Sequence, residues 1–70
     1  MKEINRIFGK RIRELRIAAN LSQEKLAEIT GFHRTYIGMV ERGERNISLR
    51  NISILANSFN ISISELMKDI

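Results

Sequence analysis

Residues 21–43 constrain the fold of this chain most, because they carry start and stop signals for two short helices in immediate succession. The Ser22 hydroxyl can accept a hydrogen bond from a free amide of a first helical turn, and Gly31 can end that helix in a left-handed conformation. A second glycine closes the stretch in the same capping role. We therefore predict helices over about 23–30 and 34–42, joined by a tight turn.

The second of these helices opens with a polar surface. Arg34, Thr35 and Tyr36 come at its start, on the side expected to face outward. The apolar residues expected to point inward are Leu26, Ala27, Phe32, Ile37 and Val40. Two helices joined in this way, with polar side chains in the first turn of the second, form the helix-turn-helix that reads base edges in the major groove. The stretch therefore predicts an interface with double-stranded DNA.

Helical periodicity continues on both sides of this stretch. An amphipathic helix is predicted over about 3–19. Its apolar stripe is formed by Ile4, Ile7, Phe8, Ile12 and Leu15. Ser48 can cap a fourth helix, and Ser62 begins a Ser-x-x-Glu capping box for a fifth. The apolar residues of the fourth helix are Leu49, Ile52, Leu55, Ala56 and Phe59. Asn20 and Asn60 can take the left-handed positions that end the first and fourth helices.

These signals predict one compact all-α domain of five short helices over residues 1–70. The sequence shows no proline, linker, repeat or low-complexity segment. The helix-turn-helix would occupy about 22–42, and C-terminal helices that serve dimerisation would occupy about 49–70. A domain of this length needs a well packed helical core or a partner chain, so its size favours a dimer.

The charge distribution indicates a polyanionic partner. Twelve basic residues exceed eight acidic ones, for a net charge of +4, and every basic residue except Lys68 lies at or before Arg50. The first two-thirds of the chain is therefore expected to face a polyanion. The alternative is an ordinary solvated surface.

Composition also excludes several classes of site. The chain has no cysteine and one histidine, so neither a disulfide framework nor a metal centre is expected. It offers no nucleophile–base pair and no phosphate-binding loop, so we expect neither an enzyme nor a cofactor. No apolar run approaches the roughly 20 residues of a membrane span, and the N-terminus lacks the apolar core of a signal peptide. A cytoplasmic protein without membrane contact is expected.

A set of residues spread over the chain resembles the Cro/cI/Xre-type helix-turn-helix repressors, from roughly Ile7 to Met67. The residues that carry the resemblance are Leu21 to Ala27, Gly31, Phe32, Ile37, Val40 to Gly43, Leu55, Ala56, Ile61, Ser62, Glu65 and Leu66. The resemblance implies a five-helix fold of the lambda-repressor-like type. It also implies a sequence-specific, dimeric transcriptional regulator that binds a DNA operator.

Within that family, the chain looks most like the controller proteins of type II restriction–modification systems. The residues that carry this narrower resemblance are Arg34 to Ile37, Glu41 to Gly43, Arg45 and Asn46. Such proteins are small, single-domain and dimeric, and the resemblance implies regulation of the chain's own operon. One open alternative is a phage-type or chromosomal repressor of the same family. Another is an antitoxin-like module whose main partner is a protein, which would need a binding segment beyond the DNA-binding domain.

The resemblance assigns roles to residues around the second helix. Gln23 would bond a backbone phosphate and brace the recognition helix, and an amide at a helix N-terminus extends an anion-binding site. Arg34 would give a bidentate fork to guanine, Thr35 would offer a hydroxyl or a methyl to a base edge, and Tyr36 would bond a phosphate or pack on a thymine methyl. The alternative for these residues is an ordinary solvated face.

Some positions depart from the family pattern. His33 stands where a Ser or Thr N-cap is usual, so the cap is expected to be weaker or the imidazole to touch a phosphate. Gly38 lies in mid-helix, at a cost of up to about 1 kcal/mol relative to Ala that close approach to the DNA backbone could explain. Met39 takes the place of a polar base-reading residue, so an apolar contact or none is expected there. Arg45 and Asn46 would lie against the sugar-phosphate backbone.

Two further sets of residues would serve the architecture. Arg16 and Glu41 resemble the family's internal ion pair, since a buried charge without a partner costs several kcal/mol. Two roles are open for Ile61, Ile63 and Met67: they either close the bottom of the core or form a dimer interface. We expect the dimer interface, because so small a core cannot cover all of these side chains. The family's two-fold homodimer would place its recognition helices about one DNA turn apart, roughly 34 Å, on palindromic half-sites. RNA polymerase is a further candidate partner.

Overall fold

The computed structural model describes residues 2–70 and contains five helices in that range. They are α1 (Lys2–Ala18), α2 (Gln23–Thr30), α3 (Arg34–Glu41), α4 (Leu49–Ser58) and α5 (Ile63–Leu66). The predicted all-α fold with five helices is therefore confirmed, and each helix begins within one residue of its expected start.

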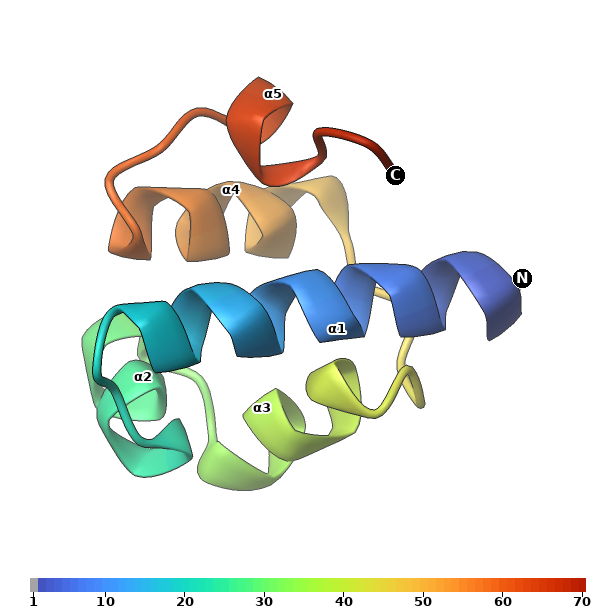
Figure 1. Ribbon diagram of the computed structural model, residues 1–70. Coiled ribbons are helices and arrows are strands. Elements are labelled where there is room, and N and C mark those ends of the chain that lie inside the picture. Colours follow the sequence, from blue (N-terminus) through green and yellow to red (C-terminus); the bar gives the residue numbers. More distant parts are fainter. Residues whose placement is uncertain (1) are drawn as a thin grey trace.

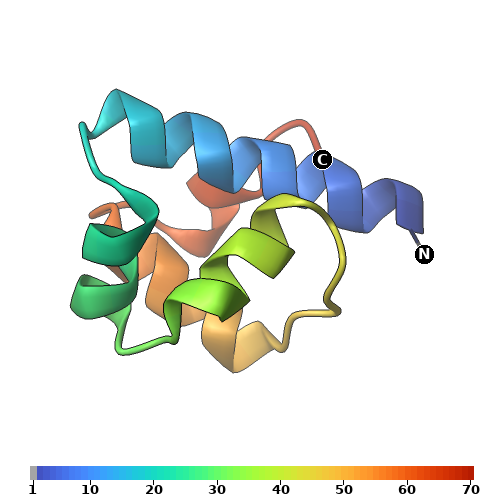
Figure 2. The same cartoon turned by 90° about the horizontal axis from the view of Figure 1, so that it is seen from below.

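α1 is the longest helix and runs along the middle of the molecule, with α2 and α3 on one side and α4 and α5 on the other (Figure 1). α1 packs against α3, α2 packs against both α3 and α4, and α5 packs against α4. Figure 2 shows the α2–α3 side, where α3 lies beside α1. None of the helices in residues 2–70 has the length and apolar character that a membrane crossing requires.

The centre of the core is built from one large side chain of each helix. The five most deeply buried large side chains are Ile12, Leu26, Ile37, Leu55 and Leu66. Phe8, Ala27, Val40 and Ala56 extend this core, and Phe32 is only half-buried at its edge. Because every helix contributes to the same centre, even the four-residue α5 is fixed to the rest of the domain.

The predicted apolar stripes are wrong at their outer ends. Ile4 and Ile7 of α1 are 45% and 42% exposed, and Leu49 at the start of α4 is 71% exposed. The first turn of α1 projects beyond the other helices, so no facing helix covers it (Figure 1). Leu49 is the first residue of α4. The side of α4 that faces the core begins one turn later, at the half-buried Ile52, and continues with the buried Leu55 and Ala56.

The predicted caps and stops account for the helix ends. The hydroxyls of Ser22, Ser48 and Ser62 accept hydrogen bonds from the amides of Lys25, Asn51 and Glu65, at 3.0, 3.1 and 3.0 Å. The predicted left-handed stops all have positive φ: Asn20 (59°), Gly31 (82°), Gly43 (76°) and Asn60 (59°). Only the serine half of the predicted Ser62–Glu65 capping box forms, because the carboxylate of Glu65 lies 3.6 Å from the Arg11 guanidinium and ties α5 to α1 instead.

Candidate nucleic-acid interface

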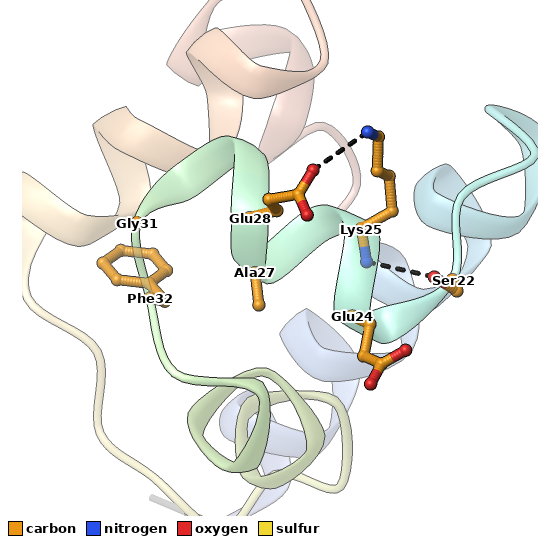
Figure 3. A pocket seen from close by; sticks show the side chains of 7 residues that line it. All are labelled: Ser22, Glu24, Lys25, Ala27, Glu28, Gly31 and Phe32. Atoms are coloured by element: carbon orange, nitrogen blue, oxygen red, sulfur yellow. Dashed lines mark hydrogen bonds and ion pairs between the residues drawn. The ribbon is translucent and has the colours of Figure 1, made fainter.

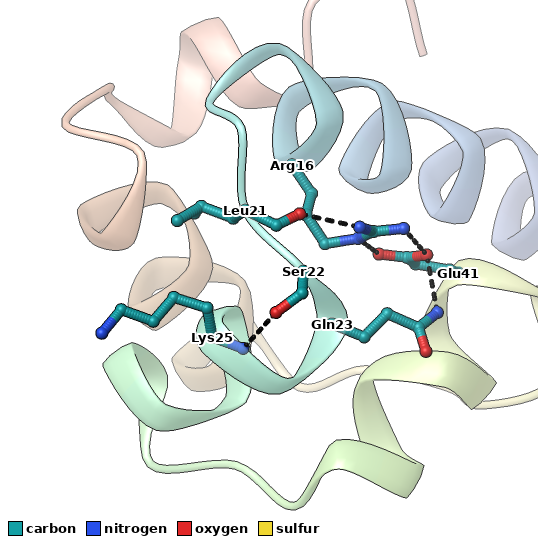
Figure 4. A network of polar contacts seen from close by, with 6 residues as sticks. All are labelled: Arg16, Leu21, Ser22, Gln23, Lys25 and Glu41. Carbon is teal, nitrogen blue, oxygen red and sulfur yellow. Dashed lines mark hydrogen bonds and ion pairs between the residues drawn. The ribbon is translucent and has the colours of Figure 1, made fainter.

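A buried ion pair fixes the end of α3 against α1. Arg16 Nε donates to Glu41 Oε2 at 2.6 Å, and Arg16 Nη2 donates to Glu41 Oε1 at 3.2 Å (Figure 4). The third donor, Arg16 Nη1, bonds the carbonyl of Leu21 at 2.8 Å. The two side chains are only 11% and 3% exposed. The structure thus brings together the two residues expected to pair, and the pair also holds the turn that leads into α2.

Gln23 belongs to the same network. Its amide Nε2 donates to Glu41 Oε1 at 3.0 Å, so the first residue of α2 is bonded to the last residue of α3 (Figure 4). The sequence predicted that Gln23 bonds a phosphate and braces the recognition helix, and the bond to Glu41 agrees with the second of these roles. The amide nitrogen carries two protons, and the bond to Glu41 uses one of them. The second proton remains available for a phosphate oxygen, so bracing α3 and binding DNA are compatible.

His33 caps α3 in place of the usual serine or threonine. Its Nδ1 accepts a hydrogen bond from the Thr35 amide at 3.1 Å, so the departure from the family pattern does not remove the cap. Because Nδ1 accepts, the proton of the neutral ring lies on Nε2. That nitrogen is the ring's remaining donor, at the exposed start of α3.

The first turn of α3 borders a shallow groove on the molecular surface. The groove is lined by Gln23, His33, Arg34, Thr35, Gly38 and Arg42. Arg34 and Thr35 are exposed, and Arg34 Nη1 lies 3.6 Å from Glu24 Oε2 in a pair whose side chains are 65% and 75% exposed. A pair this exposed contributes little and leaves the guanidinium free to turn. The structure therefore gathers four of the residues predicted to bind DNA at one surface.

Arg42 was not among the residues predicted to bind DNA, although it lines the same groove. The spacing Arg34, Gly38, Arg42 could have indicated it, because residues four apart share a helix face. Its guanidinium donates to both carboxylate oxygens of Glu44, at 3.0 and 3.2 Å. This side-chain hydrogen bond lowers the pKa of the Glu44 carboxyl and raises the pKa of Arg42.

Tyr36 is not on the open side of α3, where sequence reasoning placed it. It is half-buried, its ring meets Phe32 edge-on at 5.0 Å, and its hydroxyl accepts from Asn51 Nδ2 at 3.1 Å. The third residue of a helix lies about 200° around from the first, which turns Tyr36 away from the Arg34 side. The Arg45 guanidinium stacks on the outer face of the ring, 5.1 Å from its centroid.

The other two predicted contacts near the end of α3 differ in their surroundings. Asn46 is exposed, and its Oδ1 accepts from Asn5 Nδ2 at 2.9 Å, which ties the loop after α3 to α1. Met39 is half-buried and does not line the groove that Arg34 and Thr35 border. The doubt that the sequence raised about base reading by Met39 is therefore strengthened by its placement.

The residues assigned to a dimer interface are less exposed than expected. Ile63 is 37% exposed, whereas Ile61 and Met67 are partly buried and pack against the core. The chain after α5 turns back on itself, since the Met67 amide bonds the Ile63 carbonyl and the Ile70 amide bonds the Met67 carbonyl. This turn folds Met67 and Ile70 over the core, so Ile63 is the most exposed of the three predicted interface residues.

A second hollow lies on the outer side of α2, and the carboxylates of Glu24 and Glu28 are at its border. It is lined by Ser22, Glu24, Lys25, Ala27, Glu28, Gly31 and Phe32 (Figure 3). Its polar atoms already have partners, because Lys25 Nζ bonds Glu28 Oε1 at 2.9 Å and the Lys25 amide bonds Ser22 Oγ. The groove beside α3 is thus the better candidate for binding a polyanion.

Comparison with known proteins gives a consistent result. A helix-turn-helix family model matches residues 12–66. Control protein C.SmaI of Serratia marcescens is 51% identical over 65 residues, which cover 93% of this chain and 77% of that protein. Control protein C.BamHI of Bacillus amyloliquefaciens is 42% identical over 65 residues, covering 91% and 80%. The crystal structure of the restriction-modification controller protein C.AhdI from Aeromonas hydrophila matches with a TM-score of 0.89 at 51% identity, covering 93% of this chain and 98% of that one.

Proposed function

The chain belongs to the Cro/cI/Xre-type helix-turn-helix family of DNA-binding transcriptional regulators, and we propose that it is the controller protein of a restriction–modification system. The observation that carries the proposal is the 51% identity to a control protein over 93% of the chain. A match of this extent includes the whole recognition surface and not the helix-turn-helix alone. The protein acts in the cytoplasm on the operator of its own operon, and it is a regulator and not an enzyme.

In the proposed complex, the first turn of α3 enters the major groove. Arg34 forms a bidentate contact with guanine, and Thr35 contacts a neighbouring base edge. Both side chains are exposed beside a groove that an edge of the duplex can enter. Gln23 and His33 each keep one free donor for a phosphate on the flank of that groove.

The loop after α3 contacts the sugar-phosphate backbone in this proposal. Arg45 is held on the Tyr36 ring and Asn46 is tied to Asn5, so both are fixed relative to α3 before DNA arrives. Tyr36 then serves mainly to position Arg45, and its half-buried ring makes at most an edge contact with DNA. Such backbone contacts set the register of the protein without reading sequence.

The regulator works as a two-fold homodimer on palindromic half-sites. One domain of this size contacts few base pairs, so two recognition helices held one DNA turn apart, roughly 34 Å, are needed for useful specificity. Ile63, with the edges of Ile61 and Met67, forms the centre of the proposed contact between copies. RNA polymerase, which must share the promoter with the bound dimer, is the proposed second protein partner.

Two substitutions separate base reading from phosphate binding. Arg34→Ala should cost about 1–3 kcal/mol on duplex from upstream of the chain's own reading frame and much less on random duplex. Arg45→Ala should weaken binding to both duplexes about equally and flatten the dependence of log K on log salt by about one unit. Equal losses on both duplexes for Arg34→Ala would show that Arg34 contacts only phosphate. A complete lack of preference by the wild type for the upstream duplex would contradict the controller proposal.

A further inference from the structure

Three exposed basic side chains of α1 have no part in the interface proposed above. Arg6, Lys10 and Arg13 follow one another at spacings of four and three residues, so they lie along one side of the helix. All three are exposed. Within residues 2–70, none of them forms an ion pair, whereas Arg11 and Arg16 of the same helix do. Three charges on one side of one helix are available to a partner.

This side of α1 lies directly beside the end of the recognition helix. A Cβ added at Gly9 would come within 2.6 Å of the Glu41 carbonyl oxygen, so the two helices touch at backbone level there. A Cβ added at Gly43 would lie 2.7 Å from Arg6 Cγ, so the stem of Arg6 rests on the turn after α3. The close approach that Gly9 permits therefore brings the basic side of α1 alongside the C-terminal end of α3 and the turn that follows it.

Arg42 joins the two surfaces. It lines the groove beside the first turn of α3, together with Gln23 and Arg34. It also lines a neighbouring hollow whose other residues are Arg6, Ile7, Lys10 and Glu41. Arg42 therefore connects the groove at the start of α3 with the part of α1 that carries Arg6 and Lys10, and Arg13 continues the same side of α1 about one turn further on.

We propose that Arg6, Lys10 and Arg13 bind the phosphate backbone of the operator duplex that α3 enters, beyond the contacts made by the helix-turn-helix itself. The proposal rests on the proposed DNA-binding mode. From Arg6 to Arg13 the helix axis advances about 10 Å, at about 1.5 Å per residue. One DNA strand presents a phosphate about every 3.4 Å along the duplex, so the three side chains span about three phosphates. Flexible Lys and Arg side chains suit such contacts because phosphates need charge more than fixed geometry.

A purely structural role would predict a different outcome. Arg6 and Lys10 lie near the last carbonyls of α3, where positive side chains stabilise a helix end. If that were their whole function, removing either charge would lower the melting temperature without changing how DNA affinity depends on salt. The salt dependence therefore distinguishes a phosphate contact from a helix-end contact.

The test compares Lys10→Gln and Arg6→Gln with the matched control Lys68→Gln. Lys68 is also exposed and shares a hollow with Lys10, but it lies on the side of α5 and does not line the hollow next to α3. Affinity is measured from low to high salt on two duplexes of equal length, one from upstream of the chain's own reading frame and one of random sequence. We expect Lys10→Gln and Arg6→Gln each to flatten the slope of log K against log salt by about 0.9 on both duplexes, and Lys68→Gln to leave it unchanged.

Each other outcome overturns the proposal. Unchanged slopes for Lys10→Gln and Arg6→Gln, with or without a lower melting temperature, would leave these residues a structural role only. An equal flattening by Lys68→Gln would show a general charge effect and not a phosphate track on α1. If the wild type itself binds neither duplex in a salt-dependent manner, the proposed DNA-binding mode fails. If the wild type shows a normal slope that the α1 variants do not alter, only the proposal for α1 fails.

Discussion

α1 holds α3 on one side and α5 on the other, and it does so with two arginines in very different settings. Arg16 meets Glu41 at 2.6 Å, with side chains that are 11% and 3% exposed. Arg11 lies 3.6 Å from Glu65, with side chains that are 27% and 52% exposed, and it bonds the carbonyls of Glu65 and Leu66 at 2.9 and 3.1 Å. The arginine contact that fixes α3 is thus buried, whereas the arginine contacts to α5 are partly open to water and add to the buried Leu66.

This difference fits the roles proposed for the two helices, in which α3 reads bases and α5 contacts a second copy. A bidentate contact with a base tolerates little change in the orientation of α3, so a rigid attachment favours sequence reading. A surface that meets a second copy can be supported from the other side by that copy. Neither Arg16 nor Glu41 can be replaced alone without loss of stability, because the remaining charge would be buried without a partner.

The strongest expected effect comes from removing one charge of the buried pair. Glu41→Ala leaves the Arg16 guanidinium buried without a carboxylate, and it should lower the free energy of unfolding by about 3–5 kcal/mol. The matched variant Glu65→Ala, on the α5 side, should cost no more than about 1 kcal/mol because its pair is exposed. Urea unfolding followed by circular dichroism measures both. Similar losses for the two variants would contradict the contrast between α3 and α5.

A substitution on the C-terminal side of the molecule is expected to weaken dimer association without changing the fold. Ile63→Glu places a carboxylate at the centre of the proposed dimer contact, and desolvating it should weaken association by about 3 kcal/mol, on the order of a hundredfold. Because Ile63 is 37% exposed, the helical fold should persist. Sedimentation gives the mass and circular dichroism gives the fold. A dimer that survives would move the interface elsewhere, and an unfolded chain would assign Ile63 to the core.

Gly9 of α1 and Gly38 of α3 should respond to alanine with opposite signs. Gly9→Ala forces α1 away from the Val40 and Glu41 carbonyls and should cost about 1–3 kcal/mol of unfolding free energy. Gly38→Ala meets the end of the flexible Arg42 side chain at 3.2 Å and the Gln23 amide at an ordinary 3.7 Å, and it should gain up to about 1 kcal/mol. Thermal melts of the two variants settle the signs. A loss on Gly38→Ala as large as that on Gly9→Ala would show that α3 is confined on its outer side as well.

The exposed pair at the end of α3 should produce the smallest effect. The hydrogen bond from Arg42 lowers the pKa of Glu44, so this carboxylate stabilises the fold above its ordinary pKa and loses that contribution as pH falls through the lowered value. Both side chains are exposed, so the effect on stability should be far below that of the Arg16–Glu41 pair. An NMR titration of the Glu44 carboxyl should show its midpoint rise in Arg42→Gln. An identical midpoint in both proteins would remove Arg42 as the cause.

Local signals in the sequence were sufficient for the helices and their ends. Ser22, Ser48 and Ser62 cap the helices they precede, and Asn20 and Asn60 adopt the left-handed conformation expected of them. These predictions succeeded because capping depends on the few residues around each helix end. The pairing of Arg16 with Glu41 was implied by the family resemblance, and it agrees with the requirement that a buried charge has a partner.

Features that depend on how helices cross could not be read from the sequence. Gly9 gave no local signal of its contact with α3, because periodicity says nothing about the distance between two helix axes. The exposure of Ile4, Ile7 and Leu49 depends on where neighbouring helices end, and the half-burial of Tyr36 depends on the position of Asn51 in α4. Arg42 was missed as a surface partner of Arg34 because its position in the Glu-Arg-Gly motif suggested only a helix end.

Footprinting on the DNA upstream of the chain's own reading frame tests the central claim most directly, namely that a homodimer reads its own operator through the first turn of α3. The account predicts two protected half-sites with centres about one DNA turn apart, roughly 34 Å, related by a two-fold axis. We also expect Arg34→Ala to raise the protein concentration needed for this protection by roughly 5- to 150-fold, in line with the expected loss of about 1–3 kcal/mol. Protection of a single isolated half-site, or no protection at concentrations that already coat random DNA, would contradict it.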